Sequence, residues 1–189
     1  MKSFRQFLRE MPLAIEPEDG DEEEMKGDHR PKPKPGRRTV ETDHGVASDG
    51  EHRIVSHSLY GHTHPNAYYA THPDHGGMAV HGSTRGTDGE QRFVVHHVSR
   101  DAESGLGGAN FYKDILKTGK HKYIQSDREM TRGGQSIWRN LVHNHPDVEV
   151  TRYNVDSLTD EERPVAKGKH WHANFDGGNT VFRAKLKDK

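Results

Sequence analysis

The hydrophobic pattern of the chain changes near residue 100, and this change limits the folds that it can adopt. Before it, short segments rich in β-branched and aromatic residues are separated by Gly, Pro, Asn and Asp, a pattern typical of strands. The predicted strands of this first part are residues 52–60, 67–72, 77–83 and 92–99. An Asp49-Gly50 turn ahead of the first of them indicates a hairpin.

Beyond residue 100 the apolar residues recur at helical spacing. A Gly-rich turn at 100–108 leads into a predicted helix that ends at Gly119 and carries one apolar stripe, formed by Leu106, Ala109, Tyr112, Ile115 and Leu116. A strand at 121–126 and a second helix at 133–144 follow, and the apolar face of that helix holds Ile137, Trp138, Leu141 and Val142. The remaining predicted elements are a strand at 147–153 and a closing hairpin of 169–175 with 179–186. This order predicts an α+β or mixed-sheet domain without internal repeats.

The chain divides into a short N-terminal segment, a linker and a folded part. Residues 1–14 place apolar side chains at helical spacing, which predicts a short amphipathic helix. Residues 15–38 are acidic and then basic with alternating Pro, which predicts a disordered, charged linker. Only 29% of all residues are hydrophobic, so the core must come from the remaining part, and we expect one domain over residues 39–189.

Charge and composition exclude several classes of function. The 28 Lys and Arg residues nearly balance 29 Asp and Glu residues, so no global charge attracts nucleic acid or an anionic membrane. The chain has no Cys, which excludes disulfides and thiolate chemistry. No apolar run approaches the roughly 20 residues that cross a bilayer, so no membrane partner is expected.

The Gly-rich turn has a specific electrostatic use. The first N–H groups of a helix lack partners and carry the positive end of the helix dipole. Gly105, Gly107 and Gly108 would let an anion approach this backbone closely, as a pyrophosphate does. The turn lacks the Lys-Ser/Thr of a P-loop, and Asn110 breaks the dinucleotide fingerprint. The alternative interpretation is a plain connection that allows close helix–sheet packing.

The stretch VSRDAESGLGGANFYKDILK, followed by KYIQSD, TRGGQSIWRNL and DVEVTRY, resembles the GNAT acetyltransferase superfamily over about residues 50–185. In that family a strand leads to an Arg/Gln-x-x-Gly-x-Gly/Ala loop whose amides bind the pyrophosphate of coenzyme A. A helix, a strand, a second helix and another strand follow. The stretch SDREMTRGGQSIWRNL is similar to GNAT-like proteins encoded by tailed phages.

The resemblance implies a GNAT-like mixed, mostly antiparallel central sheet flanked by helices. It also implies transfer of an acyl group from acetyl-coenzyme A to the amine of a small molecule or protein, in the host cytoplasm or the virion. The amides of the Gly-rich loop would hold the pyrophosphate, and the edge of the preceding strand would hold the pantetheine. The residues so implied are Val98, Ser99, Ser104, Gly105, Leu106, Gly107 and Gly108.

Whether the chain is an active enzyme is open at this point. The family's Arg or Gln falls on Ala102, unless Arg100 substitutes through a longer turn, and Trp138 falls near the position of the Tyr that protonates the departing thiolate. Asp127 and Tyr112 are the candidates for catalysis. The alternative is a catalytically silent GNAT-like module, a virion or host-interaction protein that docks through its N-terminal segment.

The sixteen His residues support a competing hypothesis of metal binding. Several are closely spaced, and the segments GHTHPNAYYATHPD and HNHPDVEVTRYNVD resemble the His-x-His-Pro…Asp signature of the JAMM metalloproteases. Neither segment has the full set of residues, because Tyr153 stands where that signature has Ser and no upstream Glu lies on a clear strand. We therefore expect exposed, ordinary His residues and no metal site. The pairs are His62/His64, His72/His75, His96/His97, His143/His145 and His170/His172.

Overall fold

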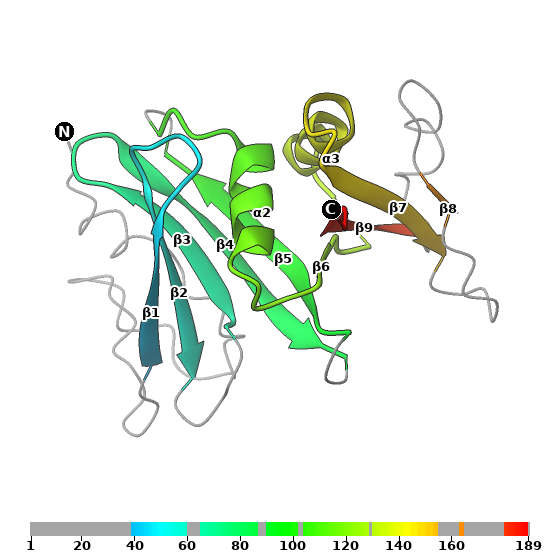
Figure 1. Ribbon diagram of the computed structural model, residues 1–189, viewed down its shortest axis with the longest axis horizontal. Coiled ribbons are helices and arrows are strands. Elements are labelled where there is room, and N and C mark those ends of the chain that lie inside the picture. Colours follow the sequence, from blue (N-terminus) through cyan, green and yellow to red (C-terminus); the bar gives the residue numbers. More distant parts are fainter. Residues whose placement is uncertain are drawn as a thin grey trace, which may run out of the picture.

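The computed structural model describes residues 39–59, 65–86, 90–101, 104–128, 130–154, 163–164 and 180–188. The predicted helix at 1–14, the predicted linker at 15–38 and the predicted strand at 169–175 lie outside these residues. The described part is an α+β structure with one mostly antiparallel sheet and two helices (Figure 1). The predicted fold class is confirmed at this level.

The sheet has nine strands within the described residues, in the order β1-β2-β3-β4-β5-β6-β9-β7-β8. The strands are β1 (Thr39–Val46), β2 (Arg53–Leu59), β3 (Ala67–His72), β4 (Gly76–Arg85), β5 (Arg92–Arg100), β6 (Tyr123–Gln125), β7 (Val148–Asn154), β8 (Arg163–Pro164) and β9 (Thr180–Leu186). All neighbouring pairs are antiparallel except β5 and β6. β9 lies between β6 and β7, so the last described strand joins the two halves of the sheet.

The turn between β1 and β2 follows from its sequence. Asp49 Oδ1 accepts hydrogen bonds from the backbone N–H groups of Glu51 and His52 at 3.0 and 3.1 Å. Gly50 has a φ of 80°, a conformation that L side chains rarely adopt. The hairpin that the Asp49-Gly50 pair predicts is therefore confirmed.

Both predicted helices are present, as α2 (Gly108–Lys117) and α3 (Arg132–Asn144). The predicted stripe of α2 is buried throughout, and Gly119 follows the helix with a φ of 69°. α2 and α3 pack on the same face of the sheet, because one core cluster joins their apolar sides to strands β2 to β7 and β9. Trp138 is at the centre of this core. The centroid of its ring system is 5.7 Å from the ring centroid of Tyr112 and 5.9 Å from that of Phe182.

The parallel strands β5 and β6 separate after a short contact. They pair only from Arg92 with Tyr123 to Val94 with Gln125, while β5 continues to Arg100. The end of β6 is drawn toward β9, because the Ser126 N–H donates to the Phe182 carbonyl and the Phe182 N–H donates to Ser126 Oγ, at 2.8 and 2.9 Å. The sheet therefore opens between β5 and the β6–β9–β7 half.

Neither α2 nor α3, the helices of the described part, is long and apolar enough to cross a membrane.

Candidate functional site

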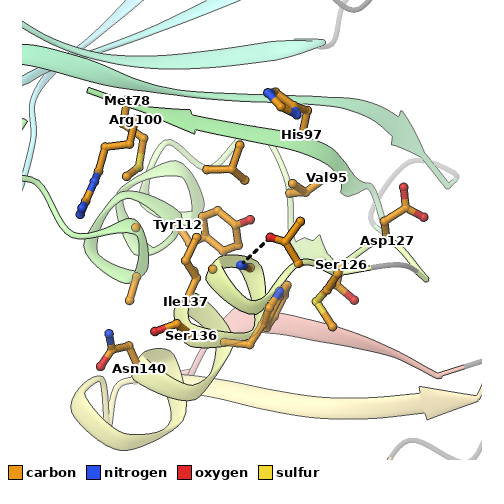
Figure 2. A pocket seen from close by; sticks show the side chains of 18 of the residues that line it. Met78, Val95, His97, Arg100, Tyr112, Ser126, Asp127, Ser136, Ile137 and Asn140 are labelled. Carbon is orange, nitrogen blue, oxygen red and sulfur yellow. Dashed lines mark hydrogen bonds between the residues drawn. The ribbon is translucent and has the colours of Figure 1, made fainter. Parts of the chain in front are cut away.

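A cavity of about 490 Å³ lies where β5 and β6 separate. Its walls come from five places: Met78 on β4, the second half of β5, the first turns of α2, the residues after β6 and the first turns of α3. In Figure 2, Met78 and Arg100 lie at one end of the cavity and Ser126 and Asp127 at the other, with Tyr112 between them. The volume falls within the range of roughly 300–1,000 Å³ that is usual for small-molecule sites.

One wall of the cavity is an open strand edge. The Asp101 N–H donates to the Gly77 carbonyl at 2.9 Å, so the backbone polar groups of residue 101 face β4. Because these groups alternate along a strand, those of Val98 and Arg100 face away from β4 and toward the cavity. Beyond Val94, no strand of the described part pairs with this edge of β5. The edge can therefore bind an extended chain that carries amide groups.

A second wall is the N-terminus of α2. The N-cap residue is Gly107, so no side chain caps the first N–H groups of the helix. The first turn contains no acidic residue either. Gly107, Gly108 and Ala109 all line the cavity. Their backbone N–H groups thus present the positive end of the helix dipole to whatever occupies the cavity. The Leu106 N–H is used within the turn, because it donates to the Ser104 carbonyl.

Two of the three glycines of this turn are required, each for a different reason, and the third is not. Gly105 has a φ of 33° and needs its backbone freedom. A Cβ on Gly108 would lie 2.7 Å from two carbons of Ile137, so this glycine permits close contact between α2 and α3. A Cβ on Gly107 would meet only the Asn110 amide nitrogen, at 3.8 Å. Gly107 is therefore the position of the three where a side chain can be added without a clash or backbone strain.

The structure places the predicted site residues in two groups. Val98, Gly107 and Gly108 line the cavity, as do Tyr112 and Asp127. The other four predicted cofactor residues are not among its lining residues: Ser104 and Leu106 are buried, Gly105 shapes the turn, and Ser99 lies on β5. Arg100 lines the same cavity as the α2 N-terminus and supplies a cationic side chain there. Ala102 lies outside the described residues.

The N-terminus of α3 also faces the cavity, which the sequence analysis did not anticipate. Thr131 is the N-cap residue and accepts a hydrogen bond from the Gly134 N–H at 3.2 Å. The first turn of α3 has no acidic residue, and Gly133 and Gly134 line the cavity. The Thr before the predicted helix is an ordinary capping signal that would have located this end. Two helix N-termini thus make the cavity favourable for negative charge.

Tyr112 extends from α2 into the middle of the cavity, between its two ends (Figure 2). Only 2% of the residue is exposed, and burial raises the pKa of its phenol above the ordinary value. The phenol therefore stays protonated at neutral pH. Trp138, packed edge-to-face against it, is a core residue as the sequence analysis predicted.

A polar pair that the sequence analysis missed lies at the opposite end of the cavity from Arg100. His96 Nδ1 and Asp127 Oδ2 are 3.2 Å apart, and both side chains are less than half exposed. His96 is at a β-bulge: His97 is in register with His81 and Val95 with Gly82, so no β4 residue is paired with His96 in the strand register. A Cβ on Gly82 would lie 2.8 Å from the Phe93 ring, so the close contact of β4 and β5 here requires glycine.

Within the described residues, no group of three His, Cys, Asp or Glu side chains is placed to hold a metal ion. His72 is engaged in its own turn, since its Nδ1 accepts from the N–H groups of Asp74 and His75. His62, His64, His170 and His172 lie outside the described residues, as do Val155 and Asp156, the last two residues of the second JAMM-like segment. The metal hypothesis therefore gains no support from the part of the chain that the structure describes.

No protein-family model matches the chain, and no curated protein or solved structure is significantly similar to it. The site combines an open strand edge, two helix N-termini, an arginine at one end and a histidine–aspartate pair at the other.

Proposed function

We propose that the chain is a GNAT-like, acyl-coenzyme A-dependent N-acyltransferase. The observation that carries this proposal is the juxtaposition of the uncapped α2 N-terminus with the open edge of β5, across one cavity. A ligand with a phosphate group joined to an extended amide chain suits both features at once. The order strand, Gly-rich turn, helix, strand, helix and strand also agrees with the arrangement expected from the resemblance.

The cofactor would lie along the cavity in one direction. Its pyrophosphate would accept hydrogen bonds from the amides of Gly107 to Ala109, with Arg100 supplying positive charge at the same end. Its pantetheine amides would bond to the backbone of Val98 and Arg100, in the manner of an added strand. This orientation directs the thioester toward the end where Ser126 and Asp127 lie, beside the bulge at His96.

The chemistry requires removal of a proton from the amine and return of a proton to the departing thiolate. His96, held by Asp127, is the candidate proton acceptor at the thioester end. Tyr112 is the candidate proton donor, because burial keeps its phenol protonated within the same cavity. Attack by the amine on the bound thioester would then proceed in a ternary complex.

Calorimetric titration with acetyl-coenzyme A tests the binding step, with variants of Gly107 as probes. A carboxylate about 5 Å from the pyrophosphate repels it. At an effective dielectric constant of about 20, this repulsion makes the binding free energy about 3 kcal/mol less favourable, which lowers the affinity about 100-fold. Solvent screening lowers this, so Gly107→Glu should weaken binding by between about 10-fold and 100-fold. Gly107→Ala is the matched control, because its Cβ meets no atom nearer than 3.8 Å. Pantetheine, which lacks the pyrophosphate, should bind wild type and Gly107→Glu equally.

Thiol release from acetyl-coenzyme A over a panel of amines then tests turnover. We expect amine-dependent release that is lowered at least tenfold in His96→Gln and in Tyr112→Phe. Tight binding without amine-dependent release would favour the catalytically silent module instead. Absence of binding at millimolar acetyl-coenzyme A, with the protein folded, would refute the proposal.

A further inference from the structure

We propose that Ser83, His96 and Asp127 form a nucleophilic triad in which Ser83 Oγ takes acyl groups from small activated esters or thioesters. This activity goes beyond amine acylation, and it does not require that coenzyme A is the ligand of the cavity. Ser83 lies on β4, His96 on the bulge of β5, and Asp127 just after β6. The fold thus brings together three residues that are 13 and 31 positions apart in sequence.

The hydrogen bonds of the imidazole define the role of each residue. His96 Nδ1 is 3.2 Å from Asp127 Oδ2, and His96 Nε2 is 2.9 Å from Ser83 Oγ. An ionised carboxylate only accepts hydrogen bonds, so it fixes the proton of a neutral imidazole on Nδ1. Nε2 is then an acceptor, and the hydroxyl that it faces is that of Ser83. This is the geometry of a serine nucleophile, its base and the carboxylate that orients the base.

The backbone around the triad holds it in place. Asp127 Oδ1 accepts a hydrogen bond from the Arg128 N–H at 2.7 Å, which leaves Oδ2 directed at His96. His96 is the extra residue of the bulge, whereas in a regular strand residue 96 would be paired with a β4 residue. The bulge therefore changes the direction of the His96 side chain. Ser83 is partly exposed, and His96 and Asp127 line the cavity. Ser83 is not among the lining residues of the cavity, so an acyl substrate would reach its hydroxyl from the exposed surface beside it.

A second Ser–His pair in the same chain shows what the carboxylate adds. Ser56 Oγ lies 2.8 Å from His44 Nε2, almost the distance of the Ser83–His96 pair. Among the described residues, no carboxylate hydrogen-bonds to His44, and Ser56 is buried with 1% exposure. Burial also lowers the pKa of the His44 imidazole. The pair at His44 and Ser56 therefore lacks both the orienting carboxylate and access for a substrate.

The proposed reaction has two balanced steps. In the first step, Ser83 gives its hydroxyl proton to His96 Nε2 while Oγ bonds to the acyl carbon. The bond from that carbon to the leaving oxygen or sulfur then breaks, and the leaving group takes the proton from Nε2. In the second, water gives a proton to Nε2 and its oxygen attacks the acyl-serine. The ester bond to Oγ breaks, Oγ regains the proton, and the carboxylic acid is released.

The test uses p-nitrophenyl acetate and a fluorophosphonate with the full-length chain. The good leaving group of p-nitrophenyl acetate makes its hydrolysis least dependent on oxyanion stabilisation. We expect Ser83→Ala to lower its turnover about 100-fold, and His96→Gln and Asp127→Asn to lower it at least tenfold. Fluorophosphonate should add one phosphonyl group per chain, on Ser83, as located by peptide mass spectrometry.

Ser56→Ala is the matched control, and it should retain wild-type ester hydrolysis and labelling. Hydrolysis that persists in Ser83→Ala would come from exposed imidazoles acting alone and would refute the triad, as would labelling at another residue. The triad does not depend on coenzyme A, so loss of hydrolysis and labelling in Ser83→Ala supports it whether or not calorimetry shows that acetyl-coenzyme A binds. Circular dichroism of each variant confirms that a loss does not arise from unfolding.

Discussion

Replacement of Gly108 by Ala gives the sharpest test of how the cavity is built. The added Cβ would lie 2.7 Å from both Cδ1 and Cγ1 of Ile137, about 1 Å closer than the usual 3.5–4.0 Å between carbon atoms. Such overpacking typically costs about 1–3 kcal/mol. The higher helix propensity of Ala returns up to about 1 kcal/mol, and less at the first turn. Gly108→Ala should therefore lower the free energy of unfolding by about 1–2 kcal/mol.

The same substitution should behave differently when Ile137 is shortened. In an Ile137→Ala background the two offending carbons are absent, so Gly108→Ala should be neutral or slightly stabilising. Urea unfolding of the four proteins gives a double-mutant cycle, for which we expect a coupling energy of about 1–3 kcal/mol. A coupling below about 0.5 kcal/mol would refute the contact between α2 and α3 on which the shape of the cavity depends.

Three further predictions concern the core, the separated strands and pH. Trp138→Ala should destabilise the fold by about 3–5 kcal/mol in thermal or urea unfolding, because its ring is buried between Tyr112 and Phe182. Ser126→Ala removes the acceptor of the Phe182 N–H, so we expect a loss of about 1–3 kcal/mol by the same measurement. Burial, and then the neighbouring imidazoles of His97 and His57, lower the pKa of His81. The unfolded chain thus binds the proton more readily, and stability should fall as the pH drops below about 6.5. His81→Gln should flatten this dependence, whereas an unchanged slope would contradict it.

The helices and most strands could be predicted because their signals are local. The apolar stripe of α2 repeats within one segment, and its ends are marked by Gly107 and Gly119. The Gly-rich turn is visible in the sequence, and two of its residues, Gly107 and Gly108, line the cavity. The separate roles of its glycines could not be predicted, because Gly108 is required by its contact with Ile137, which lies on another helix.

The opening of the sheet could not be predicted, because it depends on strand order rather than on residues 92–125. β9 comes last in the described chain and yet lies between β6 and β7, where it draws the end of β6 away from β5. The bulge at His96 likewise requires Gly82 on the neighbouring strand. The grouping of Ser83, His96 and Asp127 follows from both features, so no single stretch of sequence predicts it.

The most direct test of the proposed cofactor site is amide NMR of the labelled full-length chain during titration with coenzyme A. The amide signals of Gly107, Gly108 and Ala109 should shift as phosphate oxygens accept their hydrogen bonds, together with those of Val98 and Arg100 on the open edge of β5. Pantetheine alone should shift only the β5 signals. Saturable binding that leaves the amides of Gly107 to Ala109 unshifted, or no shift at millimolar coenzyme A, would contradict the account.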